Sequence, residues 1–222
     1  MNSPAKHIDH TLLKSDASGA DIASLCEEAV EHGFASVCVP PSYVPQASQL
    51  LYGSGVAVCT VIGFPLGYQT TETKVFEARQ AVSAGASEVD MVINLGSVRN
   101  ADFTLVGDDI RRVVAAAENA VVKVIIECCL LNNAEKRKLV DIVVESGAGY
   151  VKTSTGFGGG GATVEAVSTM IHCAAGRIQV KASGGIRTLD EMNRFLDLGA
   201  TRIGTSAGVA IVRSWHELRL SQ

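Results

Sequence analysis

Four times in this chain, a glycine ends a helical pattern and a strand-like run begins two or three residues later. Gly33, Gly85, Gly147 and Gly199 all stand in this position. Glycine tolerates the left-handed conformation that commonly closes a helix, so each case predicts a short loop from a helix into a strand. Repeated units of this kind are typical of α/β proteins with a parallel sheet.

The number of units favours a closed barrel. Predicted strands cover residues 7–12, 36–39, 56–61, 88–93, 121–127, 150–152, 178–183 and 202–205. Amphipathic helices are expected between them, and one such helix should bury a stripe of Ile22, Leu25, Cys26, Ala29 and Val30. Helix-starting capping boxes are predicted at Ser18–Asp21, Asn132–Glu135 and Thr188–Glu191. We predict a (β/α)8 TIM barrel formed by a single domain over residues 1–222, with an open doubly wound sheet as the alternative.

Composition excludes several classes of protein. The net charge of −4 offers no generally cationic surface, so we expect neither nucleic acid nor a membrane as a partner. The first seven residues lack the apolar core of a signal peptide, and no apolar run reaches the length of a membrane span. The six cysteines show no C-x-x-C spacing, as in proteins that keep their thiols reduced. A soluble cytoplasmic protein is the expectation.

Strand alternation predicts an unusual barrel interior. In each predicted strand the apolar set should face the helices, which directs the alternate residues inward. The inward set then contains three lysines and several carboxylates: Asp9, Glu88, Asp90, Lys123, Glu127, Lys152 and Lys181. A buried network of ion pairs would explain this set without any chemistry. Because such networks seldom stabilise a protein more than an apolar core does, a catalytic role is the stronger interpretation.

Two neighbouring inward lysines point to amine chemistry. Desolvation and a second positive charge both lower the pKa of a lysine, and an uncharged amine attacks carbonyl groups. Lys152 and Lys181 fit this description, and Asp90 could accept a proton or hold a water that does. These groups suffice for an aldol reaction through a Schiff base, although strand position alone does not choose between the two lysines.

A phosphate site is predicted beside the lysines. Gly184 and Gly185 follow one lysine-bearing strand, with Arg187 as a source of positive charge, and Gly204, Thr205 and Ser206 end the last strand. Phosphate groups commonly bind after the seventh and eighth strands of this fold. The five histidines show no metal-ligand spacing, so we expect neither a metal nor another cofactor, and His10 is interpreted as structural.

Several motifs closely resemble the deoxyribose-phosphate aldolase family. They occur in the family's order and span nearly the whole chain: residues 8–11, 61–67, 88–92, 122–127, 152–157, 180–187 and 202–206. Lys-Thr-Ser-Thr-Gly-Phe at 152–157 and Lys-Ala-Ser-Gly-Gly-Ile-Arg at 181–187 are the most specific. The resemblance implies a metal-free class I aldolase that reversibly cleaves 2-deoxy-D-ribose 5-phosphate to D-glyceraldehyde 3-phosphate and acetaldehyde.

The resemblance also implies roles for individual residues. Lys152 would form the Schiff base, Lys181 would perturb it, and Asp90 would relay protons. The implied substrate-binding residues are Asp9, Thr11, Cys38, Lys123, Gly156, Gly184, Gly185, Gly204, Thr205 and Ser206. A homo-oligomer, either a dimer or a tetramer, is expected.

Two departures bear on this expectation. Phe157 stands where some members carry a lysine, and the chain ends without the tyrosine that assists proton transfer in some members. The alternatives are another class I aldolase or transaldolase acting on a ketose phosphate, and a non-catalytic sugar-phosphate binder whose lysines only neutralise the phosphate.

Overall fold

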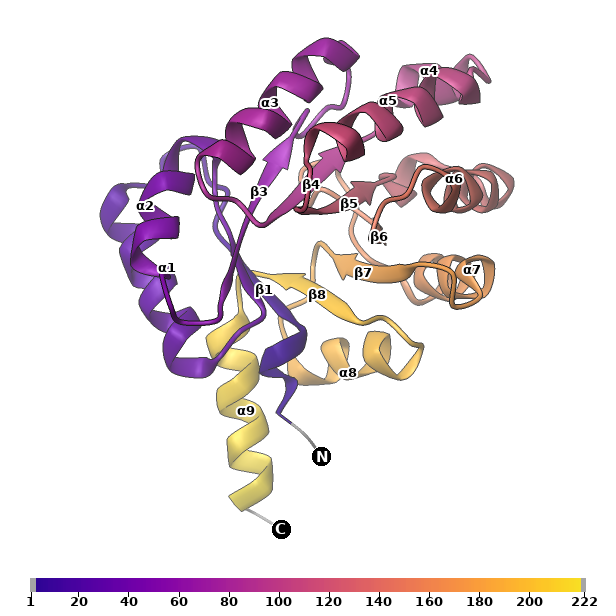
Figure 1. Ribbon diagram of the computed structural model, residues 1–222. Helices are drawn as coiled ribbons and strands as arrows, with labels where there is room; N and C mark the ends of the chain where they lie inside the picture. Colours follow the sequence, from indigo (N-terminus) through magenta and orange to yellow (C-terminus); the bar gives the residue numbers. More distant parts are fainter. Residues whose placement is uncertain (1–2, 221–222) are drawn as a thin grey trace.

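The computed structural model describes residues 3–220. It contains eight parallel strands, and Figure 1 shows helices arranged around them. Each strand pairs with the next, and β8 pairs with β1, so the sheet closes into a barrel. The strands are β1 (Ile8–Thr11), β2 (Ser36–Cys38), β3 (Ala57–Ile62), β4 (Glu88–Val92), β5 (Val121–Ile125), β6 (Tyr150–Lys152), β7 (Gln179–Ser183) and β8 (Arg202–Thr205). The predicted (β/α)8 barrel is confirmed.

The helices form the outer layer. They are α1 (Gly19–His32), α2 (Val44–Leu50), α3 (Thr71–Ser83), α4 (Leu95–Arg99), α5 (Phe103–Ala116), α6 (Asn133–Glu145), α7 (Val164–Ala174), α8 (Leu189–Asp197) and α9 (Gly208–Leu220). Short 3-10 turns cover Pro4–His7, Pro41–Tyr43 and Cys128–Leu130. Both described ends of the chain lie at the same end of the barrel, beside α9 (Figure 1). No helix within residues 3–220 is both long enough and apolar enough to cross a membrane.

Helix starts and stops follow the sequence closely. The three predicted capping boxes form at the starts of α1, α6 and α8. At the end of α1, Gly33 adopts the left-handed conformation with φ +67°, which lets the chain turn into β2. The predicted buried stripe of α1 is wrong at its last position. Val30 is 47% exposed, because eight residues after Ile22 it lies at the edge of the buried stripe, where it lines a surface hollow with Glu27 and Leu50.

The main core lies between the sheet and the helices. One set of alternate strand residues is buried there, including Val89 and Met91 of β4 and Val122 and Val124 of β5. This is the apolar set that alternation predicted to face outward. His10 belongs to the same outward side: its Nε2 lies 2.7 Å from Glu28 Oε2, and its ring packs against Phe34 at 4.9 Å. Both contacts give His10 a structural place.

The expected inward position of Glu127 is wrong. β5 ends at Ile125, and Glu127 follows it with a left-handed backbone (φ +53°). Its carboxylate accepts hydrogen bonds from the Thr155 backbone amide and hydroxyl. Glu127 therefore holds the segment after β6 and forms no ion pair with the inward lysines Lys123, Lys152 and Lys181. The expectations about residues 1–2 and 221–222, including the chain ending without a tyrosine, lie outside the described residues.

Candidate active site

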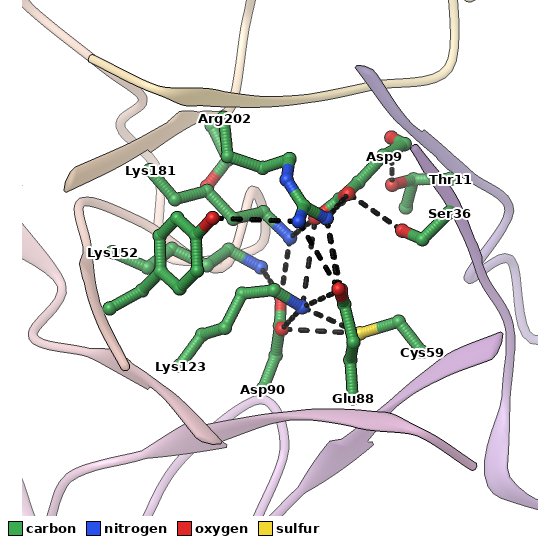
Figure 2. Close-up of polar contacts among 12 residues, drawn as sticks. Asp9, Thr11, Ser36, Cys59, Glu88, Asp90, Lys123, Lys152, Lys181 and Arg202 are labelled. Atoms are coloured by element: carbon green, nitrogen blue, oxygen red, sulfur yellow. Dashed lines mark hydrogen bonds and ion pairs between the residues drawn. The ribbon is translucent and has the colours of Figure 1, made fainter. Parts of the chain in front are cut away.

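Three lysines converge on one buried aspartate inside the barrel (Figure 2). Asp90 Oδ2 lies 2.7 Å from Lys152 Nζ and 2.7 Å from Lys181 Nζ, and Asp90 Oδ1 lies 2.8 Å from Lys123 Nζ. Lys152 and Lys181 are direct partners in the register of β6 and β7, so their side chains enter the barrel at the same depth. The two amines share one carboxylate oxygen, which keeps them close to each other.

A second aspartate supports Lys181 from β1. Asp9 Oδ2 lies 2.5 Å from Lys181 Nζ and 3.7 Å from Lys123 Nζ. Its other oxygen accepts a hydrogen bond of 2.6 Å from the Ser36 hydroxyl. Gly204 of β8 makes room for this arrangement, because a Cβ there would lie 3.2 Å from Lys181 Cε and 2.9 Å from Ser183 Cβ.

Arg202 and Glu88 extend this set of ion pairs. The Arg202 Nη1 atom lies 2.6 Å from Asp9 Oδ1 and 3.0 Å from Glu88 Oε2, and Glu88 Oε2 lies 2.6 Å from Lys123 Nζ. The guanidinium group also lies 5.4 Å from the centre of the Tyr150 ring. Figure 2 shows Arg202 reaching across the barrel interior to these carboxylates. Together, seven ion-paired residues form the charged cluster: Asp9, Glu88, Asp90, Lys123, Lys152, Lys181 and Arg202.

Ion pairing outweighs burial for the groups in the charged cluster. Burial alone disfavours the Asp90 carboxylate, but Lys123, Lys152 and Lys181 hold its pKa well below the usual range. Asp9 behaves in the same way, with its pKa lowered by Lys181, Lys123 and Arg202 against the effect of burial.

The partners of Asp9 and Asp90 shift in the opposite direction. Burial acts to lower the pKa of Lys181, but Asp9 and Asp90 raise it above its usual value. Lys123 is raised well above its usual pKa for the same reason, with Asp90 as its strongest partner. Lys181 and Lys123 are therefore cations at neutral pH.

A cavity of about 240 Å³ lies at the carboxyl ends of the strands. Of the three lysines that contact Asp90, only Lys152 is among the residues that line it. The other predicted site residues on its wall are Thr11, Gly156, Gly184, Gly185, Gly204, Thr205 and Ser206. The structure thus brings the predicted Schiff-base lysine and the predicted phosphate-binding segments into one cavity.

The remaining predicted site residues lie beneath the cavity wall. Asp9, Cys38, Asp90, Lys123 and Lys181 are each fully buried and are absent from the cavity lining. In addition, the Thr205 hydroxyl already donates to the Ile186 carbonyl at 2.7 Å and accepts from the Ala207 amide, so it joins two segments of the cavity rim.

Several functional candidates were missed by sequence reasoning. Strand alternation already places Glu88 on the inward face with Asp90 but gives it no role, and it could have identified Arg202 in the same way, two residues before Gly204. Both residues belong to the charged cluster. Lys14 also lines the cavity, together with the predicted Arg187, and both are exposed. Lys14 follows β1 in a loop, where no periodic pattern indicates which way a side chain points.

Phe157, which stands where some family members carry a lysine, lines the cavity. Its ring meets the Phe64 ring, from the segment after β3, edge to face, with 5.4 Å between the two ring centroids. Two loops that are distant in sequence therefore meet at the cavity mouth. Positive charge at this mouth comes from Lys14 and Arg187.

Cys38, Cys59 and Asp90 bring potential metal-ligating atoms within 4.8 Å of one another. The rest of the environment does not suit a cation. Asp90 already pairs with three ammonium groups, and the Cys59 sulfur accepts a hydrogen bond of 3.2 Å from Lys123 Nζ. A divalent ion would therefore enter a region that already carries concentrated positive charge.

Known proteins resemble this chain in both sequence and fold. The profile of DeoC/LacD family aldolases matches residues 5–217. A deoxyribose-phosphate aldolase of Geobacillus sp. strain WCH70 is 56% identical over 212 residues, covering 95% of each chain. The structure of the aldolase QR15 has a TM-score of 0.95 at 41% identity and covers 99% of each chain. The tetrameric deoxyribose phosphate aldolase of Aeropyrum pernix has a TM-score of 0.90 at 37% identity, covering 96% of this chain and 91% of its own. With a family match over almost its entire length, this chain belongs to the DeoC/LacD family of aldolases.

Proposed function

We propose that this protein is a class I aldolase that reversibly cleaves 2-deoxy-D-ribose 5-phosphate to D-glyceraldehyde 3-phosphate and acetaldehyde, with Lys152 as the Schiff-base lysine. One observation carries the choice of lysine. Lys152 is the member of the lysine trio on Asp90 that lines the cavity, and its Nζ contacts a single carboxylate. Its relatives' names supply the substrate class.

The reaction begins when the uncharged Lys152 amine attacks the aldehyde carbon of the open-chain sugar. Loss of water gives an iminium ion, which withdraws electrons from the adjacent carbons. A water molecule held at the site then takes the proton from the 3-hydroxyl, the C2–C3 bond breaks, its electrons form the enamine, and glyceraldehyde 3-phosphate leaves. Protonation of the remaining enamine and hydrolysis of the iminium release acetaldehyde and restore the amine.

Lys181 and Asp90 have complementary parts in this scheme. Lys181 keeps its charge because Asp9 and Asp90 raise its pKa, so a positive neighbour stays beside the reacting amine. Asp90 has a pKa well below its usual range, which makes it a weak base at neutral pH. We therefore assign Asp90 to holding the two amines, and a water molecule between the reacting groups, in place.

The glycine-rich wall of the cavity suits the phosphate group. Gly184 and Gly185 adopt positive φ angles of +89° and +81°, and a Cβ at Gly185 would meet no atom within 4 Å, so a ligand has space beside the backbone. Gly204, in the adjacent strand β8, and Ser206, just after that strand and shortly before α9, also line the cavity. Lys14 and Arg187 supply the positive charge that Phe157 lacks.

Asp9, Lys123 and Cys38, which the sequence predicted as substrate-binding residues, are assigned to positioning the substrate from beneath the cavity wall. Asp9 and Lys123 act through Lys181 and Asp90, which they contact. Cys38 lies close to Asp90 and Cys59. We assign Thr11 and Gly156, both on the wall, to contacts with the sugar.

We further propose that residues 1–222 work as one domain in a cytoplasmic homo-oligomer. The tetrameric Aeropyrum pernix relative supports oligomerisation. All six cysteines lie within residues 3–220 and have free thiols, which suits a reducing compartment.

Reductive trapping tests the assignment. Acetaldehyde and borohydride should leave an ethyl group on Lys152, located by mass analysis of peptides. An adduct on Lys181 or Lys14 would refute the assigned role, and the Lys152→Ala variant supplies the background. Turnover with dihydroxyacetone phosphate in place of acetaldehyde as the donor would instead support an aldolase for ketose phosphates. Tight binding of the sugar phosphate without any adduct would indicate a non-catalytic binder.

A further inference from the structure

The charged cluster contains one more cation than it has carboxylates. Its ion pairs join four cations, Lys123, Lys152, Lys181 and Arg202, to three carboxylates, Asp9, Glu88 and Asp90. The most exposed of these side chains is Arg202, at 13%. An uncompensated charge is costly in such an enclosed region, so the cluster is most stable when one cation is neutral.

The contacts indicate which cation gives up its proton. Arginine stays charged in proteins. Lys123 contacts three carboxylates of the cluster and Lys181 contacts two, whereas Lys152 contacts one, Asp90. Loss of the proton from Lys152 therefore breaks one ion pair, the smallest loss available to the three lysines.

We propose that Arg202 is a positioning residue for the reaction: by occupying Asp9 and Glu88, its charge leaves the three carboxylates able to balance only two of the three lysines, and so keeps the Lys152 amine uncharged. The proposal rests on the proposed function of Lys152. Arg202 is not one of the residues that line the cavity; it acts through Asp9 on Lys181 and through Glu88 on Lys123. Without its charge, three lysines would face three carboxylates, and each lysine could hold its proton.

The other titratable groups around Lys152 leave this count unchanged when the thiols are neutral. Cys59 donates to Asp90 Oδ1 at 3.2 Å, and burial raises its pKa. A hydrogen bond with Cys59 lowers the pKa of Cys38, so this thiol is an alternative source of negative charge. The buried Glu127 carboxylate is bound to the Thr155 amide and hydroxyl and lies outside the charged cluster. Lys14 and Arg187 stand exposed at the cavity mouth, where water screens their charges.

The test measures the rate of reductive trapping by acetaldehyde and borohydride as a function of pH. Arg202→Gln should move the acid limb of the profile up by about one pH unit, which is a tenfold loss of rate on that limb. Glu88→Gln removes a negative charge and should move the limb down by a similar amount. The double variant restores the wild-type excess and should return the limb to its wild-type place, and Arg202→Lys should behave like the wild type.

Opposite displacements distinguish this role from a merely structural one. If Arg202→Gln and Glu88→Gln both lower the rate and leave the limb in place, or if both move it in the same direction, the proposal fails. Cys38→Ser should leave the limb in place; a downward displacement as large as that of Glu88→Gln would assign the missing negative charge to the thiolate and overturn the proposal. If Arg202→Gln does not fold, as circular dichroism would reveal, Glu88→Gln decides the question alone. Trapping of the wild type at a lysine other than Lys152 would refute the proposed function itself, which separates the two failures.

Discussion

Two buried ion clusters within residues 3–220 differ in balance and in access. Between α3 and α5, Lys74 Nζ lies 2.5 Å from Asp109 Oδ2 and 3.0 Å from the Val92 carbonyl oxygen. This pair has one cation and one carboxylate, and its side chains are at most 4% exposed. The charged cluster inside the barrel has four cations and three carboxylates, and one of its lysines lines a cavity.

This contrast shows how burial of a lysine is to be interpreted. Both clusters bury lysine ammonium groups away from water, so burial alone does not indicate chemistry. Lys74 is neutralised by its own partner and fixes the end of β4 through the Val92 carbonyl, which is a scaffold role. Lys152 shares its partner with two other amines and borders the space where a substrate would bind. Imbalance and access together, more than burial, mark the reactive lysine.

The largest expected effect is on activity. Lys152→Ala should lower kcat/KM for 2-deoxyribose 5-phosphate by about a thousandfold or more, because the covalent route is lost. Its thermal unfolding midpoint should stay close to that of the wild type, since the remaining three cations still balance the three carboxylates of the charged cluster. An assay of aldehyde release together with a thermal melt measures both quantities. Substantial residual turnover would contradict the contrast between the two clusters.

The next effect is on stability. Lys74→Met should lower the free energy of unfolding by about 3–5 kcal/mol, because it leaves the Asp109 carboxylate buried without a partner. The matched double variant Lys74→Met/Asp109→Leu removes both charges and should recover most of that loss. Urea unfolding of the wild type and both variants gives the comparison. If the single and double variants are equally unstable, the balance of the pair is not what stabilises it.

Stability should also depend on pH through the barrel cluster. The pKa values of Asp9 and Asp90 are lowered in the folded state, so their contribution is complete above the ordinary carboxyl pKa of about 4 and is lost as the pH falls below it. Lys123 and Lys181 have raised pKa values, so their contribution is lost only as the pH rises above about 10.5. The contribution of these groups to the free energy of unfolding should thus be constant between about pH 4 and about pH 10.5 and decline at lower and at higher pH.

Denaturant unfolding across a pH series tests this shape. Asp9→Asn removes one of the shifted carboxylates and should flatten the acid decline relative to the wild type. An acid decline of unchanged steepness in Asp9→Asn would show that Asp9 is not among the groups responsible.

The smallest effect is expected at the edge of the cluster. Ser36→Ala removes the 2.6 Å hydrogen bond to Asp9 Oδ1, which should cost about 1 kcal/mol of stability. Asp9 keeps its contacts with Arg202 and Lys181, so activity should change little. A melt and a rate measurement on the same preparation suffice. A loss of activity comparable to that of Lys152→Ala would mean that the cluster depends on each hydrogen bond more than on its charge balance.

Sequence reasoning reached the barrel and its polar interior because both depend on periodicity. Glycine after a helix and alternation along a strand are local signals, and they placed Asp90, Lys123, Lys152 and Lys181 on one side of the sheet. Glu127 was misplaced because the left-handed turn after Ile125 ends the alternation, and a non-glycine residue in that conformation leaves little trace in sequence. Alternation could also have placed Arg202 inside the barrel, but its role depends on contacts with Asp9 and Glu88, which come from strands distant in sequence.

Alternation along the strands allows the activity of such a protein to evolve separately from its fold. On β4, Val89 and Met91 attach the sheet to its helices, while Glu88 and Asp90 face the interior of the barrel. The residues that specify the fold and the residues that carry the chemistry thus alternate within the same short strand. Substitutions at the inward positions can therefore alter the reaction, while the outward positions continue to specify the same scaffold.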